Sequence, residues 1–426
     1  MNSPSHCRGE KPWNVVFWLW GAFFIAYVTR QSIFSIFPIL RKELGFTEVQ
    51  LGLTGTVFLW AYALGNPFGG WLSDRVSKKH LIVSSVLLWS VCTFTTGLAK
   101  SPAGLLAWRA ALAVAQSLYI VTAISLITQA HTEYNRSKAL SLHGTAQFAG
   151  IAFGGWYGGF VAEAMDWRWM LWFASAAGAV YVPLLFHKLP VSKPVTGPCA
   201  ERGRAESLQV LSIPTYLFLC LSFVVINAML WMIYAWFPDF LHDKFQMSLA
   251  ASGWTATIYV QLATIVGILG GAAVADQLVQ KSFRGRFYVL LAGLVLACPF
   301  FHAVGQASTL WAVKTFALGY GLFKGAFLAN FFASVIDIVP ERSRGFALGF
   351  ANMIGSLSGG LAAYLVGFLK SYIQPEALFS LGSGLGAFAA ASLVFSVWKF
   401  FPIDYRNAHP SATDRMLAIQ ATPVTD

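Results

Sequence analysis

The segment GWLSDRVSKK, residues 70–79, separates two long apolar runs and decides the fold class of the chain. It opens with Gly70, reaches an acid at Asp74 and ends in a basic cluster, Arg75, Lys78 and Lys79. Glycine lets neighbouring helices approach closely, an acid can interact with a helix N-terminus or a basic partner, and basic residues are typical of cytoplasmic loops. We therefore expect a tight turn over residues 70–74 between two membrane-spanning helices.

The composition extends this expectation to the whole chain. Of 426 residues, 57% are hydrophobic and 11% are charged, whereas soluble domains are about a quarter charged. Apolar runs such as 15–27, 105–127 and 289–301 approach or exceed the roughly 20 residues that a helix needs to cross a bilayer. The alternation of polar and apolar residues that marks barrel strands is not seen, so the spans are expected to be helices.

Hydropathy predicts an all-α membrane protein with twelve transmembrane helices in two pseudo-symmetric six-helix bundles. The first six spans lie near 13–37, 51–72, 81–99, 103–128, 139–162 and 169–186, and the second six near 214–237, 251–274, 287–304, 310–336, 346–369 and 378–398. The predicted parts are an N-terminal bundle at 1–187, a cytoplasmic linker at 188–212, a C-terminal bundle at 213–402 and a cytoplasmic tail at 403–426. The linker is the longest internal polar stretch and contains three prolines.

The distribution of basic residues orients these spans. With both termini in the cytoplasm, 19 of the 29 Lys and Arg residues fall in inside segments, six fall outside and four lie within spans. Positive residues favour the cytoplasmic side, so this orientation is predicted. The net charge of +11 is spread over short loops and forms no basic face, so no nucleic-acid partner is expected.

A degenerate copy of the opening segment occurs in the second half. Gly270, Gly271 and Asp276 follow the predicted eighth span, with Arg284 and Arg286 beyond. A duplicated arrangement of six plus six helices requires such a copy at this point. It differs from the first segment in having an alanine, residue 272, at the position of the first glycine.

The segment and its copy resemble the loop signature of the major facilitator superfamily, and the resemblance covers the chain from the first span to the twelfth. It implies the major facilitator fold and secondary transport by alternating access. Gly70, Asp74, Arg75, Lys78 and the copy's Asp276 would then be gating residues, which help to latch the cytoplasmic side when the carrier faces outward.

Within the superfamily, the chain is most similar to the anion:cation symporter group, which carries sugar acids and carboxylates, with the organophosphate:phosphate antiporters as neighbours. Four stretches carry this resemblance: YVTR at 27–30, Arg109 followed by Gln116, DWRWM at 166–170 and WFPDFL at 236–241. Symporters of this group typically carry an acid at the position of Gln116 that is implicated in proton coupling. The antiporters carry an arginine at the position of Leu230. Proton symport and anion exchange both stay open.

Charged residues within the spans indicate an anion, independently of any family. Four cations lie there, Arg30, Arg109, Lys314 and Lys324, whereas all 18 acids fall in loops or within a few residues of a span end. A charge inside the membrane normally faces a partner or a water-filled path. Arg30 and Arg109 lie roughly 10 and 9 Å from the outer ends of their helices, so the two guanidinium groups could clamp a carboxylate or phosphate.

Further candidates come from the second half and from polar residues on single helical faces. Lys324 lies roughly 21 Å from the outer end of its span, near the midplane, while Lys314 is expected to reach the outer interface. The polar candidates for the substrate site are Tyr27, Gln116, His143, Gln147, Asn227, Tyr234 and Asn352. Such side chains suit the hydroxyl groups of a sugar acid, but they also commonly join helices. Arg109 could likewise bond backbone carbonyl groups.

The predicted function is secondary active transport of a small organic anion, a sugar acid or other carboxylate, coupled to protons. Organophosphate or other anion exchange and a non-transporting membrane sensor are the alternatives. No nucleotide-binding, HExxH or triad pattern is present, so no enzyme, cofactor or metal is expected. The expected partners are the anionic substrate, a coupling ion that can be a proton, and the bilayer; we expect a monomer in a bacterial inner membrane.

Overall fold

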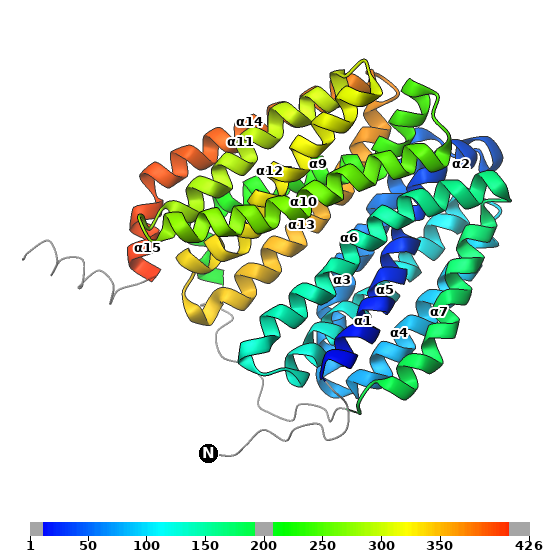
Figure 1. The fold of residues 1–426 in the computed structure, drawn as a ribbon, viewed down its shortest axis with the longest axis horizontal. Helices are drawn as coiled ribbons and strands as arrows, with labels where there is room; N and C mark the ends of the chain where they lie inside the picture. Colours follow the sequence, from blue (N-terminus) through cyan, green and yellow to red (C-terminus); the bar gives the residue numbers. More distant parts are fainter. Residues whose placement is uncertain (1–11, 192–207, 409–426) are drawn as a thin grey trace, which may run out of the picture. The chain divides into compact units, whose positions relative to one another are not determined.

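The computed structural model describes residues 12–191 and 208–408 and consists of helices and short connections over those ranges (Figure 1). Up to the linker, the helices are α1 (Pro12–Ser32), the 3₁₀ turn η1 (Ile33–Ile36), α2 (Phe37–Leu44), α3 (Glu48–Arg75), α4 (Lys78–Gly97), α5 (Pro102–Ala130), α6 (Glu133–Ala164) and α7 (Arg168–Lys188). After it come η2 (Gln209–Ser212), α9 (Pro214–Phe245), α10 (Leu249–Val279), α11 (Gly285–Gln306), α12 (Leu310–Ile338), η3 (Glu341–Ser343), α13 (Arg344–Leu369), α14 (Pro375–Lys399) and α15 (Phe401–Ala408).

The predicted all-α membrane architecture is confirmed. Twelve helices of 20 residues or more occur in the described ranges, and each one overlaps a predicted span, although α1 and α4 end before their spans do. Ten of the segments meet a strict test of length and hydropathy for crossing a membrane; α3 and α6 do not. Helix α6 carries charged and polar residues along its length, including Arg136, Lys138, His143 and Gln147, and these lower its hydropathy.

Short polar motifs start several helices. Thr47 precedes α3 and forms a capping box, in which its side chain accepts a hydrogen bond from Gln50 N and the Gln50 side chain accepts one from Thr47 N. At α5 the Ser101 side chain accepts a hydrogen bond from Gly104 N, and at α12 the Thr309 side chain accepts one from Ala312 N. These side chains satisfy amide groups that have no partner within the helix, so the sequence determines locally where these helices begin.

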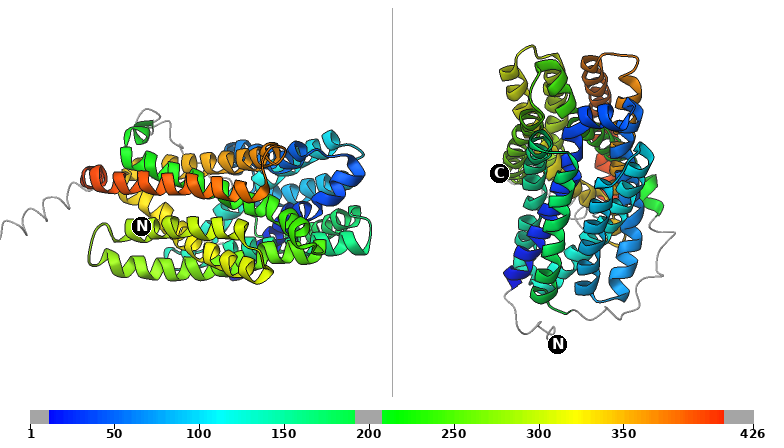
Figure 2. Two further views of the ribbon diagram at one scale, coloured as in Figure 1. Left: turned by 90° about the horizontal axis from the view of Figure 1, so that it is seen from above. Right: turned by 90° about the vertical axis from the view of Figure 1, so that its right-hand side faces the viewer.

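The described residues fall into two compact units; the first combines segments from both halves of the chain, whereas the second comes from the C-terminal half and the end of the linker. Of the described residues, the first contains 12–191, 230–261 and 359–375, and the second contains 208–229, 262–358 and 376–408. In the first unit α1 packs against α6 and α7, α3 against α5, and α4 against α5 and α7, as Figures 1 and 2 show. In the second, α11 packs against α12. The predicted bundle boundaries at 187 and 213 stay a prediction, and most of the predicted linker and tail lies outside the described residues.

The predicted tight turn over residues 70–74 is wrong. Helix α3 continues through Gly70 and Asp74 to Arg75, and only Val76 and Ser77 separate it from α4. A glycine within a transmembrane helix is tolerated where a neighbouring helix packs against it. The segment is therefore the end of one helix and the start of the next, with a two-residue turn between them.

The close helix approach predicted at Gly70 occurs one residue earlier. A Cβ added at Gly69 would lie 3.2 Å from Leu118 Cα on α5, whereas one at Gly70 would meet Val121 Cγ1 at an ordinary 3.6 Å. A Cβ at Gly65 would collide with Ser117 of α5. Gly65 and Gly69 form a GxxxG pair, the spacing that lets two helix backbones approach.

The second unit repeats this packing. Added Cβ atoms at Gly267 and Gly271 of α10 would collide with Leu322 and Ala326 of α12, the latter with its Cα at 2.6 Å, whereas one at Gly270 would meet nothing within 4 Å. In the copy, Gly271 corresponds to Gly69. The alanine at 272 therefore falls at a position where the first half needs no glycine, and the packing is kept.

We expect Gly271→Ala to lower the free energy of unfolding by about 1–3 kcal/mol, because a methyl group forced against Ala326 overpacks the α10–α12 contact. The neighbouring variant Gly270→Ala has open space and should be neutral, or more stable by up to about 1 kcal/mol. Thermal unfolding of the purified protein in detergent checks both. Equal shifts for the two variants would contradict this account of the packing.

Candidate functional site

Arg30 lies among four aromatic rings. Its side chain is in the last turn of α1 and the residue is 7% exposed. The guanidinium carbon lies 4.6 Å from the ring centre of Phe58, 4.8 Å from Trp231 and 5.2 Å from both Tyr27 and Tyr62. Aromatic faces stabilise a cation without using its N–H groups. The Nε atom is buried and has no hydrogen-bond partner in the described part of the chain.

Arg109 of α5 lies beside Arg30. It is 1% exposed, and its Nε donates a hydrogen bond of 3.2 Å to the carbonyl oxygen of Thr54. Its guanidinium carbon is 5.1 Å from the ring centre of Phe58, which Arg30 also contacts, and 5.7 Å from Phe34. The Nη2 atom is buried without a partner among the described residues. Arg109 thus forms a hydrogen bond to a backbone carbonyl group, as the structural alternative predicts. Its Nη2 group can still donate a hydrogen bond to a ligand.

The two arginines make an uncompensated cationic centre. No ion pair in the described ranges includes either of them. Two neighbouring like charges raise each other's energy in a medium of low dielectric constant, so an anion placed between them would be strongly favoured. Arg30 and Arg109, which the sequence predicts at similar distances from the outer ends of their helices, thus lie close together in the structure.

Tyr234 and two glutamines border this centre. Gln31 donates a hydrogen bond of 3.0 Å to the backbone oxygen of Tyr234, and Gln261 Nε2 lies 2.9 Å from the Tyr234 hydroxyl oxygen. The Tyr234 ring meets Trp231 edge to face, with the ring centres 5.6 Å apart. The amide and hydroxyl groups of this border can form hydrogen bonds with uncharged oxygen atoms of a ligand.

Gln116 and His143 are both engaged in bonds between helices. Gln116 Nε2 donates to the carbonyl oxygen of Ala26 at 3.3 Å. The Tyr119 hydroxyl donates to the carbonyl oxygen of Leu19 at 2.6 Å, so His143 Nε2, 3.3 Å away, is the donor of the bond between them. His143 also stacks on Phe23, with 4.6 Å between the ring centres. Both contacts are what the helix-joining interpretation expected.

The remaining predicted substrate residues are more scattered. Gln147 is half-buried on α6, and Asn352 of α13 is exposed. Asn227 donates to the carbonyl oxygen of Phe223 in its own helix, at 2.8 Å. Lys324 is 1% exposed and lies 5.9 Å from the Tyr320 ring centre in the second unit. Asn227, Asn352 and Lys324 stay predictions as substrate residues.

The predicted gating residues differ in burial. Asp74 and Asp276 are exposed at the ends of α3 and α10. Arg75 is also exposed, donates a 3.2 Å hydrogen bond to the Trp71 carbonyl oxygen and lies over the Trp71 ring. Lys78 is fully buried at the start of α4. Their gating role stays a prediction, as does that of Gly70.

A buried acid anchors an ionic network that the sequence did not predict. Asp239 has a fully buried side chain, which pairs with Arg41 at 3.1 Å and with Lys370 at 2.6 Å. Glu48 also pairs with both cations, and Asp243 lies 3.7 Å from Lys370. Burial favours the neutral form of Lys370, but the charge and hydrogen bond of Asp239 outweigh it, so the pKa of Lys370 is raised.

Asp239 lies within a helix that extends beyond the predicted span. The predicted span ended before Pro238, but α9 continues through this proline to Phe245. Proline is tolerated in transmembrane helices when neighbouring groups satisfy the freed carbonyl. Asp239 is part of the motif WFPDFL, but its ion-pair partners, Arg41 and Lys370, are distant in sequence and meet it only in the folded chain.

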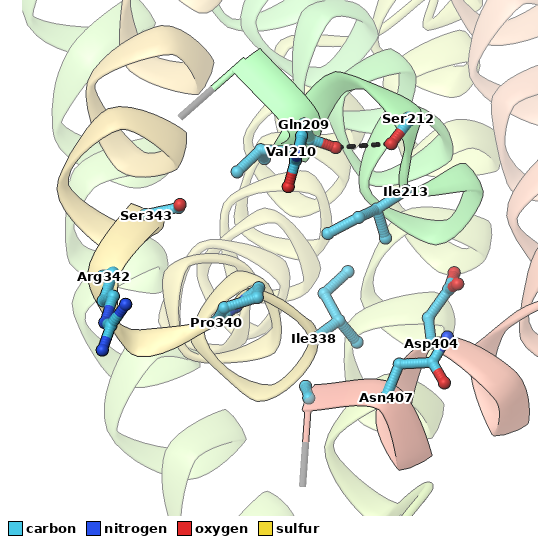
Figure 3. A pocket seen from close by; sticks show the side chains of 11 residues that line it. Gln209, Val210, Ser212, Ile213, Ile338, Pro340, Arg342, Ser343, Asp404 and Asn407 are labelled. Atoms are coloured by element: carbon cyan, nitrogen blue, oxygen red, sulfur yellow. Dashed lines mark hydrogen bonds between the residues drawn. The ribbon is translucent and has the colours of Figure 1, made fainter. Parts of the chain in front are cut away.

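A separate cavity of about 420 Å³ lies within the second unit (Figure 3). Its lining comes from η2, the connection between α12 and α13, and α15, and it contains none of the predicted substrate residues. Asp404 in its wall accepts a 3.0 Å hydrogen bond from Thr215 N at the start of α9. No group of three or more His, Cys, Asp or Glu residues that could hold a metal occurs in the searched ranges.

Sequence reasoning missed Phe58, Tyr62 and Gln261 at the site. Phe58 and Tyr62 are four residues apart on α3 and therefore share one helical face, which was the signal available in the sequence. Gln261 had no such signal, because its partner Tyr234 lies on a different helix.

The chain matches one family model and is similar to transporters from two bacteria. The family model described as Major Facilitator Superfamily matches residues 19–321 and 219–423. The chain is 23% identical to a D-galactonate transporter of Escherichia coli over 372 residues, 81% of this chain and 86% of that protein. It is 24% identical to a hexuronate transporter of Bacillus subtilis over 395 residues, 89% of this chain and 93% of that protein.

A solved structure shows the same fold. It is the crystal structure of a bacterial homologue of the human lysosomal transporter Spinster, inward-facing and unoccupied, with a TM-score of 0.72 and 21% identity over 94% of this chain and 98% of that one.

Proposed function

Because the chain belongs to the major facilitator superfamily, we propose that it transports a small organic anion, and that this anion is a sugar acid or related carboxylate. The chain is a multi-pass membrane transporter and not an enzyme. One observation carries the proposal: Arg30 and Arg109 contact the same Phe58 ring and each keeps a buried N–H group without a partner in the described ranges. The similarity to transporters of D-galactonate and hexuronate supports the choice of a sugar acid.

In this proposal the guanidinium groups bind the substrate carboxylate. An arginine fork offers parallel N–H groups that match the two oxygens of a carboxylate. The aromatic rings lie within 5.2 Å of the guanidinium carbon of Arg30 and stabilise its charge without pairing it with a carboxylate of the protein. The rings of Tyr27 and Tyr62 lie against Arg30, and the ring of Tyr234 meets that of Trp231; tyrosine hydroxyl groups suit the hydroxyl groups of a sugar acid.

The transport cycle proposed is alternating access of two bundles around this site. The buried Asp239 network would close one end of the path while its pairs with Arg41 and Lys370 are intact. The segment around Gly70, Asp74, Arg75 and Lys78, with Asp276 in the second half, would latch the other end. We place both termini on the cytoplasmic side of a bacterial inner membrane, in keeping with the distribution of basic residues.

We propose proton symport as the coupling, with the proton carried by the substrate. Anion exchange is the second candidate, because a glutamine stands at position 116 where symporters of the resembling group carry an acid. An inward proton gradient that accelerates uptake into proteoliposomes supports symport; uptake that responds only to a trapped counter-anion supports exchange.

The decisive experiment measures uptake into proteoliposomes with three labelled compounds: D-galactonate, glucose 6-phosphate and the neutral sugar D-galactose. We expect saturable uptake of D-galactonate that excess unlabelled hexuronate inhibits, and none of D-galactose, because only an anion compensates the two arginines. If glucose 6-phosphate is the one compound taken up, the substrate is a phosphate ester and not a carboxylate. Uptake of D-galactose alone, or binding of D-galactonate with no uptake by folded protein, would overturn the proposal.

A further inference from the structure

Gln261 of α10 is a buried amide with a hydrogen-bond partner within the described chain at only one of its two polar atoms. The residue is 1% exposed. Its Nε2 atom lies 2.9 Å from the Tyr234 hydroxyl oxygen, and its Oε1 atom is buried with no partner among the described residues. Turning the amide by 180° exchanges the two atoms and leaves the other one without a partner. A buried polar group of this kind costs free energy until something bonds to it.

This amide borders the arginine centre. Tyr234, its partner, lies three residues after Trp231 on α9, and the Trp231 ring covers Arg30 at 4.8 Å. The backbone oxygen of Tyr234 is held by Gln31, the residue next to Arg30 in α1. All of these residues belong to the first unit. The unpartnered amide atom therefore lies at the edge of the cluster that is proposed to bind the carboxylate.

We propose that Gln261 recognises a hydroxyl group of the substrate, so that the site selects hydroxylated carboxylates over carboxylates that lack this hydroxyl. The inference rests on the proposed function. A hydroxyl both donates and accepts hydrogen bonds, so it completes the Gln261 amide in either orientation. A site whose buried polar group would be left unbonded discriminates strongly against an analogue without the matching hydroxyl.

The test compares two probes, D-galactonate and hexanoate, which has a carboxylate and no hydroxyl groups. Wild-type protein should bind D-galactonate much more tightly than hexanoate. Gln261→Met keeps the length of the side chain and removes the amide, so it should weaken D-galactonate binding at least about tenfold and leave hexanoate binding within about twofold, by titration calorimetry. Gln306→Met, at an exposed glutamine on α11, is the matched control and should change neither affinity.

A second variant keeps the test valid if Gln261→Met does not fold. Gln261→Asn retains the amide but withdraws it by one methylene, so it should also weaken D-galactonate selectively. An unchanged D-galactonate affinity in a folded variant, or an equal loss for both probes, would overturn the inference, because a purely structural glutamine would affect both alike. Wild-type protein that binds neither carboxylate would instead overturn the proposed function and this inference with it.

Discussion

Replacing Arg30 by glutamine is expected to weaken the binding of D-galactonate about a hundredfold. Hydrogen bonds to a charged group contribute about 1.5–3 kcal/mol each, and the loss of a paired set corresponds to two or more factors of ten in Kd. Arg30→Lys keeps the charge but loses the planar fork, so a loss of about tenfold is expected. Titration calorimetry or a ligand-dependent thermal shift measures both variants.

Arg406→Gln is the control for this prediction. Arg406 is an exposed arginine on α15 in the second unit, and its replacement should leave D-galactonate affinity unchanged. If Arg30→Gln binds D-galactonate as well as wild type, or if Arg406→Gln weakens binding as much, the carboxylate does not depend on the aromatic-lined arginine.

Replacing Asp239 by asparagine is expected to lower the free energy of unfolding by about 3 kcal/mol. Removing the fully buried carboxylate leaves Arg41 and Lys370 to share the partly exposed Glu48 as their acidic partner, and breaking a buried ion pair is strongly destabilising. Here Arg41 and Lys370 would both lose their fully buried carboxylate. The measurement is thermal unfolding at neutral pH. Removing Lys370 as well, in Asp239→Asn with Lys370→Gln, should cost less than the sum of the two single changes.

Asp166→Asn provides the matched comparison. Asp166 pairs with Arg168 at 3.1 Å, but its side chain is 46% exposed, and exposed pairs contribute only about 0–1 kcal/mol. A similar small change in both aspartate variants would show that the Asp239 network is as weak as a surface pair. In proteoliposomes, Asp239→Asn should also reduce uptake of D-galactonate, because the proposed closure of one end depends on it.

The helices and their order follow from local sequence. Long apolar runs predict spans because a backbone in lipid must satisfy its own hydrogen bonds, and in the structure the side chains of Thr47, Ser101 and Thr309 cap three of the helix starts. The two errors have local causes. Residues 70–74, where a turn is expected, continue α3, and α9 continues through Pro238, before which the predicted span ends, to Phe245.

The charges of the site were also visible in the sequence. Arg30 and Arg109 stood out because a cation in an apolar span costs free energy unless something compensates it, and their depth followed from the rise per residue of a helix. The sequence by itself therefore determined the membrane fold, the two cations and the class of ligand that they favour.

Only the tertiary structure decided which residues from different helices meet. It brought Phe58, Tyr62 and Trp231 onto Arg30, Gln261 onto Tyr234, and Arg41 and Lys370 onto Asp239. It also put the close contact at Gly69 in place of Gly70. The physical reason is that helical periodicity specifies a face, whereas the rotation and register of two packed helices depend on side chains distant in sequence.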